Sequence, residues 1–273
     1  MHTKDLVLQP LASSAAVMAQ EDLEAGVAIV DIGGGTTDLA VFNEGILKHT
    51  AVIPFAGENI TNDIKSGLGV LRTQAEQMKV QFGSALANEA KSNAYITIPG
   101  LRGMPAKEIS VKNLANIIQA RMSEILSFVT FHLKQVGMDN KMMNGGIVLT
   151  GGGSQLKHLI QLTEYATGLN ARIGYPNEHL ASNHIAELEK PMYSTCIGLI
   201  LKGYSVYENN QNRLFPEQRH TQLKPPVQVE EQSAPEMVIK AIPIKERKTL
   251  KGFMDSIKGG LIDLFKEDGD SAL

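Results

Sequence analysis

Hydrophobic positions along the chain predict alternating strands and helices. Continuous apolar runs bounded by turn residues indicate buried strands, whereas apolar residues at three- and four-residue steps indicate amphipathic helices. Strands are predicted at Val27 to Ile32, Leu39 to Phe42, Ile46 to Ile53, Ala94 to Ile98, Gly145 to Thr150 and Arg172 to Tyr175. Helices are predicted at Ile60 to Leu68, Thr73 to Phe82, Val111 to Val136 and Ser194 to Lys202. This alternation predicts an α/β fold.

The pattern changes after residue 207. Prolines among Gln, Glu, Asn and Lys fill residues 208–249, and we expect a flexible linker because such a segment buries little apolar surface. Residues 250–266 follow as a predicted amphipathic helix, whose apolar face consists of Leu250, Phe253, Met254, Ile257, Leu261, Leu264 and Phe265. From Lys245 to Lys266 there are six Lys or Arg and three acidic residues, a local charge of +3. Such a helix suits an anionic lipid surface. The alternative is packing on the body or on a partner.

Composition narrows the possible classes of protein. The 273 residues carry a net charge of -3, which does not favour nucleic acid as a partner. No apolar run approaches the roughly 20 residues of a membrane span. The single cysteine, Cys196, excludes an internal disulfide, and its apolar neighbours predict a buried thiol in a reducing compartment.

Two glycine-rich turns are the candidate chemistry. The first lies between two predicted strands and reads Asp31-Ile32-Gly33-Gly34-Gly35-Thr36-Thr37-Asp38. Glycines let backbone N–H groups approach an anion, the threonines add hydroxyl donors, and Asp31 can hold Mg²⁺ through a water. The second turn opens a predicted helix after a buried strand and reads Gly151-Gly152-Gly153-Ser154, at a helix N-terminus that favours phosphate or a polar adenosine edge. Either turn alone is also compatible with a turn that binds nothing.

The order of the two turns resembles the second phosphate motif and the adenosine motif of the actin, DnaK and sugar-kinase superfamily. Glu76 and Lys79, three apart on a predicted helix, match the pair that contacts ribose and base in that superfamily; otherwise they form a surface ion pair. Glu58, in the segment Gly57 to Thr61, matches a position near the nucleotide, although the same residues also suit a helix start.

Within the superfamily the chain resembles FtsA cell division proteins. The matching segments are Leu8 to Ser13, Gly26 to Phe42, Val52 to Gly57, Ala75 to Gly83, Ile147 to Ser154 and Tyr193 to Leu199. The resemblance implies an actin-like, ribonuclease-H-like second-half lobe at residues 1–82 and 146–207. It also implies a small inserted lobe at residues 83–145.

The resemblance implies a division adaptor that binds ATP and Mg²⁺ and anchors the division ring to the membrane. The inserted lobe would bind the C-terminal tail of FtsZ with help from Arg121, although Arg121 also suits a solvated helix surface. The helix at residues 250–266 would hold the protein at the cytoplasmic face of the cell membrane at the division site, and self-association is compatible with the family.

The chain begins where the second half of the family fold begins. We therefore expect one wall of the nucleotide site, weakened ATP affinity and at most weak ATPase activity, with part of Met1 to Leu11 forming a strand without its neighbours. Two alternatives stay open. One is a phosphotransferase or chaperone-type ATPase of the same superfamily, and the other is an inactive truncated remnant.

Overall fold

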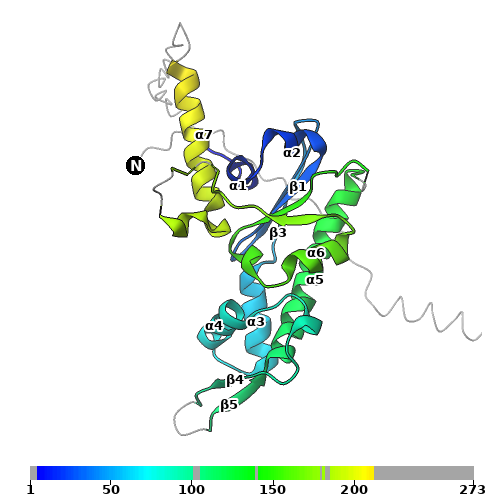
Figure 1. Cartoon of the computed structure of the whole chain (residues 1–273), viewed down its shortest axis with the longest axis vertical. Coiled ribbons are helices and arrows are strands. Elements are labelled where there is room, and N and C mark those ends of the chain that lie inside the picture. Colours follow the sequence, from blue (N-terminus) through cyan, green and yellow to red (C-terminus); the bar gives the residue numbers. More distant parts are fainter. Residues whose placement is uncertain (1–4, 101–104, 139–140, 179, 182–184, 212–273) are drawn as a thin grey trace, which may run out of the picture. The chain divides into compact units, whose positions relative to one another are not determined.

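The computed structural model describes residues 5–100, 105–138, 141–178, 180–181 and 185–211. Its main sheet has the strand order β3-β2-β1-β6-β7 (Figure 1). The strands are β1 (Val27–Ile32), β2 (Thr37–Asn43), β3 (Ile46–Ile53), β6 (Gly146–Thr150) and β7 (Ala171–Ile173). β1 pairs antiparallel with β2 and parallel with β6, so it is the central strand.

Both faces of the central strand are buried, which explains why five of its six residues are apolar. Because alternate side chains point to opposite faces, Val27 and Ile29 join one core cluster, whereas Val30 and Ile32 join the other. The first cluster includes residues of α1 (Gln9–Val17) and α7 (Ser194–Gln211). The second includes residues of the helices α3 (Gly57–Leu68), α5 (Val111–Gln135) and α6 (Leu159–Thr167).

A helical group lies beyond one end of the sheet in Figure 1. It contains α3 (Gly57–Leu68), α4 (Arg72–Phe82), α5 (Val111–Gln135) and a hairpin of β4 (Tyr95–Ile98) and β5 (Lys107–Ser110). The apolar stripe of α5 is buried, and α3 packs against both α4 and α5. The helical group begins at Gly57 and includes α3 and α4, which precede the predicted inserted lobe at residues 83–145.

The start of the chain departs from the prediction. Asp5 to Leu8 have no regular secondary structure, and α1 begins at Gln9 with Pro10 in its first turn, so the strand expected within Met1 to Leu11 is wrong over these residues. α1 crosses α7 so closely that a Cβ on Gly198 would lie 1.8 Å from the Ala12 carbonyl oxygen.

Helix α7 also differs from its expected form. It continues past Lys202 to Gln211 and so occupies the first residues of the predicted linker. Cys196 lies on its exposed side, which corrects the expectation of a buried thiol. The rest of the linker and the apolar residues from Leu250 to Phe265 lie outside the described residues. None of the described helices is both long and apolar enough to cross a membrane.

Candidate functional site

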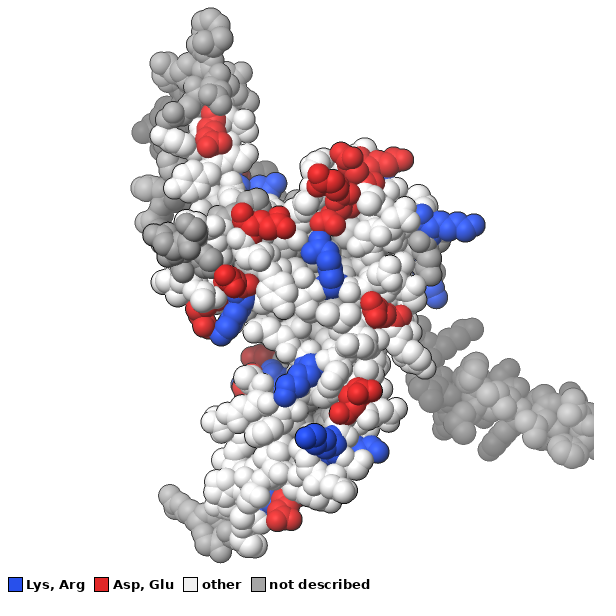
Figure 2. Space-filling model, viewed as in Figure 1, with Lys and Arg blue, Asp and Glu red and all other residues white. Residues whose placement is uncertain are grey.

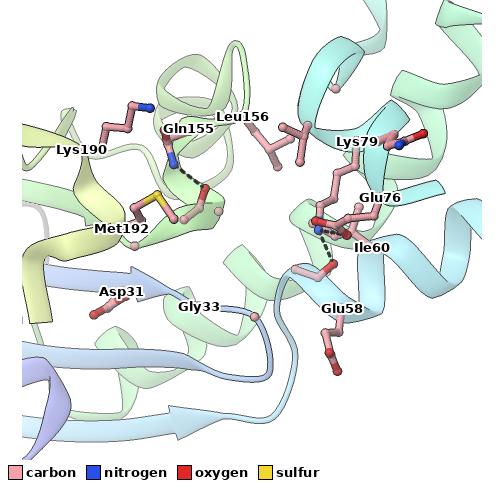
Figure 3. Close-up of a pocket in the computed structure, with 18 of the residues that line it drawn as sticks. Asp31, Gly33, Glu58, Ile60, Glu76, Lys79, Gln155, Leu156, Lys190 and Met192 are labelled. Carbon is pink, nitrogen blue, oxygen red and sulfur yellow. Dashed lines mark hydrogen bonds and ion pairs between the residues drawn. The ribbon is translucent and has the colours of Figure 1, made fainter. Parts of the chain in front are cut away.

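A cleft of about 1260 Å³ separates the ends of the sheet strands from helices α3 and α4 (Figure 3). Nine of the predicted nucleotide-site residues line it: Asp31, Gly33, Gly34, Glu58, Glu76, Lys79, Gly151, Gly152 and Gly153. We call the side formed by the two glycine-rich turns the sheet wall, and the side formed by α3 and α4 the helix wall. Segments far apart in sequence thus meet at one cavity.

Asp31 is the penultimate residue of β1, lies at the base of the sheet wall and is 2% exposed. Its Oδ2 accepts hydrogen bonds from Ser13 Oγ at 2.6 Å, Thr195 Oγ1 at 3.1 Å and Gln9 Nε2 at 3.4 Å. These donors are uncharged, so they orient the carboxylate without neutralising it. Ser13 and Thr195 come from α1 and α7, and the close crossing of these two helices therefore positions Asp31.

A second carboxylate stands opposite Asp31. Asp38 on β2 is the cross-strand partner of Asp31 and is 4% exposed. Burial raises the pKa of the Asp38 carboxyl, the Thr36 hydroxyl bond partly offsets this rise, and the charge of Asp31 adds to it. Like charges directly opposite one another in a sheet are destabilising, so this end of the sheet wall favours a cation nearby.

The second turn depends on glycine at Gly151. Its φ is +80°, and a Cβ there would lie 2.4 Å from Asp31 Oδ1 and 2.6 Å from the Ile32 carbonyl oxygen. Only a residue without a side chain adopts this conformation so close to another backbone. Gly151 therefore brings the second turn against the end of β1, and the two turns form one continuous surface.

Four predicted site residues do not line the cleft. The Thr37 hydroxyl donates to the Phe55 carbonyl at 2.8 Å, and the Thr36 hydroxyl donates to Asp38 at 3.0 Å. The Ser154 hydroxyl donates to the Gly151 carbonyl at 2.8 Å and is buried. Gly35 is exposed outside the cleft lining. Thr36, Thr37 and Ser154 therefore stabilise the turns in this structure through internal hydrogen bonds.

The helix wall is organised by Lys79, whose side chain is 14% exposed. Its Nζ donates to the Gly57 carbonyl at 3.0 Å and the Thr61 hydroxyl at 2.9 Å, and it pairs with Glu76 Oε2 at 2.8 Å. Burial alone would raise the pKa of Glu76, but hydrogen bonds from Lys79 and Thr61 and the charges of Lys79 and Arg72 lower it overall. Glu76 and Lys79 therefore form an ion pair with each other, and both also line the cleft.

Several residues that line the cleft were not predicted from the sequence. Lys190, Met192 and Gln155 lie on the same side of the cleft as the second turn in Figure 3. Arg72 also lines the helix wall, where it pairs with Glu58 at 2.8 Å in an exposed contact. None of these residues belongs to a motif with fixed spacing, because tertiary packing brings their segments to the cleft.

Arg121 lies on α5 and is not among the residues that line the cleft. Its guanidinium forms two hydrogen bonds with the Asp63 carboxylate, at 2.6 and 3.1 Å, and a further one with Glu124. It also lies 5.6 Å from the centroid of the Phe55 ring. A hydrogen bond from Arg121 to Asp63 chiefly raises the pKa of Arg121. An incoming carboxylate would therefore compete with internal partners.

Charged side chains are intermixed on the face shown in Figure 2. Acidic side chains gather over α2 (Gln20–Ala25), which carries Glu21 and Asp22 in its first turn. The Lys and Arg side chains of the described residues stand apart from one another on this face, without forming a basic stripe.

The fold is similar to that of actin-like proteins. Spiroplasma citri MreB5 bound to ADP matches with a TM-score of 0.60 and 22% identity, over 76% of this chain and 61% of that chain. The PilM–PilN type IV pilus biogenesis complex matches with a TM-score of 0.56 and 20% identity, over 73% of this chain and 52% of that chain. At these identities the likeness shows the fold alone.

Sequence comparison defines the family within this class. The model of cell division protein FtsA matches residues 28–198. FtsA of Pseudomonas aeruginosa is 36% identical over 74% of this chain and 48% of its own length. FtsA of Bacillus subtilis is 37% identical over 72% of this chain and 42% of its own length. The chain belongs to the FtsA family of actin-like cell division proteins, and it spans about half the length of these relatives.

Proposed function

We propose that this chain binds ATP in the cleft and acts as part of an FtsA-type division adaptor. The convergence of both glycine-rich turns, Asp31 and the Glu76–Lys79 pair on one cavity carries this proposal. Backbone N–H groups of the turns suit phosphate oxygens, and the Glu76–Lys79 side suits the polar edges of ribose and base. We expect binding rather than rapid hydrolysis.

Magnesium fits the sheet wall. Asp31 and Asp38 are buried carboxylates in register on adjacent strands, and the hydrogen-bond donors to Asp31 are neutral. Mg²⁺ prefers carboxylate, water and phosphate oxygens. Asp31 would hold the ion through water, and the ion would supply charge stabilisation for the phosphates.

A matched pair of glycine variants tests the nucleotide proposal. Cβ atoms on Gly34 and Gly35 meet no atom within 4 Å, but only Gly34 lines the cleft. Gly34→Val should therefore fold normally and weaken binding of a fluorescent ATP analogue at least tenfold, whereas Gly35→Val should bind like the wild type. If both variants bind the ATP analogue equally well, the nucleotide does not bind in the cleft and the proposal is wrong. Titrations with and without Mg²⁺ test the role of the ion.

We further propose that the helical group binds the C-terminal tail of FtsZ near Arg121. Phe128 is 37% exposed and stacks on Phe55 at 5.6 Å, and the Arg121 guanidinium lies over the same Phe55 ring. A cation beside the half-buried Phe55 ring and the exposed Phe128 ring suits a peptide that carries both acidic and apolar side chains. The peptide must displace Asp63 or share Arg121 with it.

The competition with Asp63 gives a sharp test by fluorescence polarisation of a labelled FtsZ tail peptide. Arg121→Ala should weaken binding, whereas Asp63→Asn should strengthen it, because it removes the charge that occupies the guanidinium. Arg172→Ala is the matched control, since Arg172 forms an exposed ion pair with Asp22 on another element. If Asp63→Asn weakens binding as much as Arg121→Ala, the pair serves the fold and the binding role of Arg121 fails.

Membrane attachment is proposed for residues 250–266, outside the described part of the chain. The support is their apolar face and the local charge of +3 from Lys245 to Lys266. Flotation with anionic vesicles tests it. Phe253→Glu should abolish binding, whereas Ser256→Glu, with the same charge change away from the apolar face, should reduce it only modestly. Unchanged flotation of Phe253→Glu would refute the anchor.

A further inference from the structure

Two histidines meet where the edge strand β3 contacts helix α5. His49 Nε2 lies 3.2 Å from His132 Nδ1, and the ring centroids are 5.3 Å apart. Both side chains are partly buried, and 83 positions separate them in sequence. The contact is therefore made by the fold, and the nucleotide cleft does not include either residue.

The spacing of the facing nitrogens matches that of two ligands on one metal ion. Imidazole binds Zn²⁺ at about 2.0–2.1 Å, so two ligands of a tetrahedral ion stand roughly 3.3–3.4 Å apart. We propose that His49 and His132 form a two-histidine site for a divalent transition-metal ion such as Zn²⁺, Ni²⁺ or Cu²⁺. Small ring rotations would aim both nitrogens at one ion, and neither helix nor strand would have to move.

The protonation of the pair is compatible with metal binding. Ligating imidazoles must be neutral, and two neutral rings can share the hydrogen bond between His49 Nε2 and His132 Nδ1. In the hydrogen-bonded pair one facing nitrogen carries a proton. When the ion binds, this proton leaves the facing nitrogen and a proton occupies the outer nitrogen of the same ring, so both rings stay neutral and both lone pairs face the ion.

The surroundings do not oppose a cation. Lys48 precedes His49 in the strand and so points to the opposite face of β3, and Lys134 lies two positions along α5 from His132, away from its face. The Phe131 ring meets His132 edge-on at 5.5 Å and shields one side. His132 also lies in the last turn of α5, where the helix dipole favours positive charge.

The site has an open coordination sphere. Among the residues that the structure describes, no third His, Cys, Asp or Glu completes a cluster, so water fills the remaining positions. Binding is therefore weaker than at a four-ligand structural zinc site, and imidazole ligands favour Cu²⁺, Ni²⁺ and Zn²⁺ over Mg²⁺. A bound ion would cross-link the edge of the sheet to α5.

Calorimetric titration of the full chain without an affinity tag, with ZnCl₂ and then NiCl₂, tests the site. The chain has seven histidines, so the comparison between variants decides. His49→Gln and His132→Gln should each weaken the same binding event at least tenfold. The control His158→Gln, which replaces a partly buried histidine bonded to Ser84, should leave it unchanged. At a fivefold excess of metal over its Kd, the unfolding midpoint should rise by about 2–4 °C only where the pair is intact.

Wild-type affinity in either His49→Gln or His132→Gln would overturn the proposal. Circular dichroism without metal first establishes that each variant folds. If one does not, X-ray absorption of the Zn²⁺-loaded wild type counts the imidazole ligands directly. Two imidazoles per ion support the site, and one or none overturns it.

Discussion

The two walls of the cleft are built on different principles. The sheet wall is held by backbone packing and by neutral donors around the buried Asp31. The helix wall is held by ion pairs, of which Glu58–Arg72 is exposed and Glu76–Lys79 partly so. The sheet wall is thus organised before a ligand arrives, whereas ligand contacts on the helix wall must replace internal ones. Preorganisation of this kind decides how much of the interaction energy appears as affinity.

The largest expected effect concerns the backbone of the sheet wall. Gly151→Ala should lower the free energy of unfolding by about 3 kcal/mol or more, because strain at positive φ adds to the clash with Asp31 and Ile32. Gly152→Ala should change it by less than about 0.5 kcal/mol, since the nearest atom to its Cβ is 4.0 Å away. Urea unfolding measures both, and similar losses would show that the second turn is not fixed by Gly151.

A smaller effect is expected on the helix wall. Lys79→Met should cost about 2 kcal/mol, because three acceptors lose a shared charged donor. Arg72→Met should cost only about 0.5 kcal/mol, because both side chains of its ion pair are more than half exposed, at 61% and 60%. If the two variants are equally stable, the ion pairs of this wall do not differ in importance.

The pH dependence of the free energy of unfolding also distinguishes the two walls, and Glu76 represents the helix wall. Its folded pKa lies below the ordinary value of 4.5, so its contribution to stability is present above that value and is lost as the pH falls through the folded pKa. Glu76→Gln should therefore be less stable than the wild type at pH 7, by roughly 1 kcal/mol, and the difference should vanish in acid. Unfolding at a series of pH values checks this, and a constant difference would contradict it.

Asp38 on the sheet wall should behave in the opposite sense and give the smallest effect. Its folded pKa lies above the ordinary value of 3.8, so its contribution is full below that value and is lost as the pH rises through the folded pKa. Asp38→Asn should therefore be slightly more stable than the wild type at pH 7, with a gain that shrinks in acid. A loss of stability at pH 7 would mean that the carboxylate has a favourable partner.

Long, strongly periodic segments were predictable from the sequence. The apolar stripe of α5 and the buried run of β1 predicted the first and last residues of both elements to within one position. Helix α1 was missed because its buried face consists largely of small residues such as Ala12 and Ser13, which leave little hydrophobic contrast. β5 was missed because it buries only Ile109.

The candidate site was predictable only where its residues are contiguous. The glycine-rich turns and the Glu76–Lys79 spacing are visible in the sequence. The donors to Asp31 are not, because Thr195 lies 164 positions away and reaches it through the crossing of α1 and α7. For Arg121 the helix and the position were evident, but its partner Asp63 comes from α3, and no local pattern reveals such a contact.

The central position of β1 has a consequence for synthesis of the chain. β1 and β2 leave the ribosome before the parallel partner of β1, because β6 comes about 120 residues later. At roughly 5–20 residues per second this delay lasts about 6–24 seconds. Throughout that time one edge of a largely apolar strand has no neighbour, and such an unpaired edge is prone to pair with another chain and aggregate.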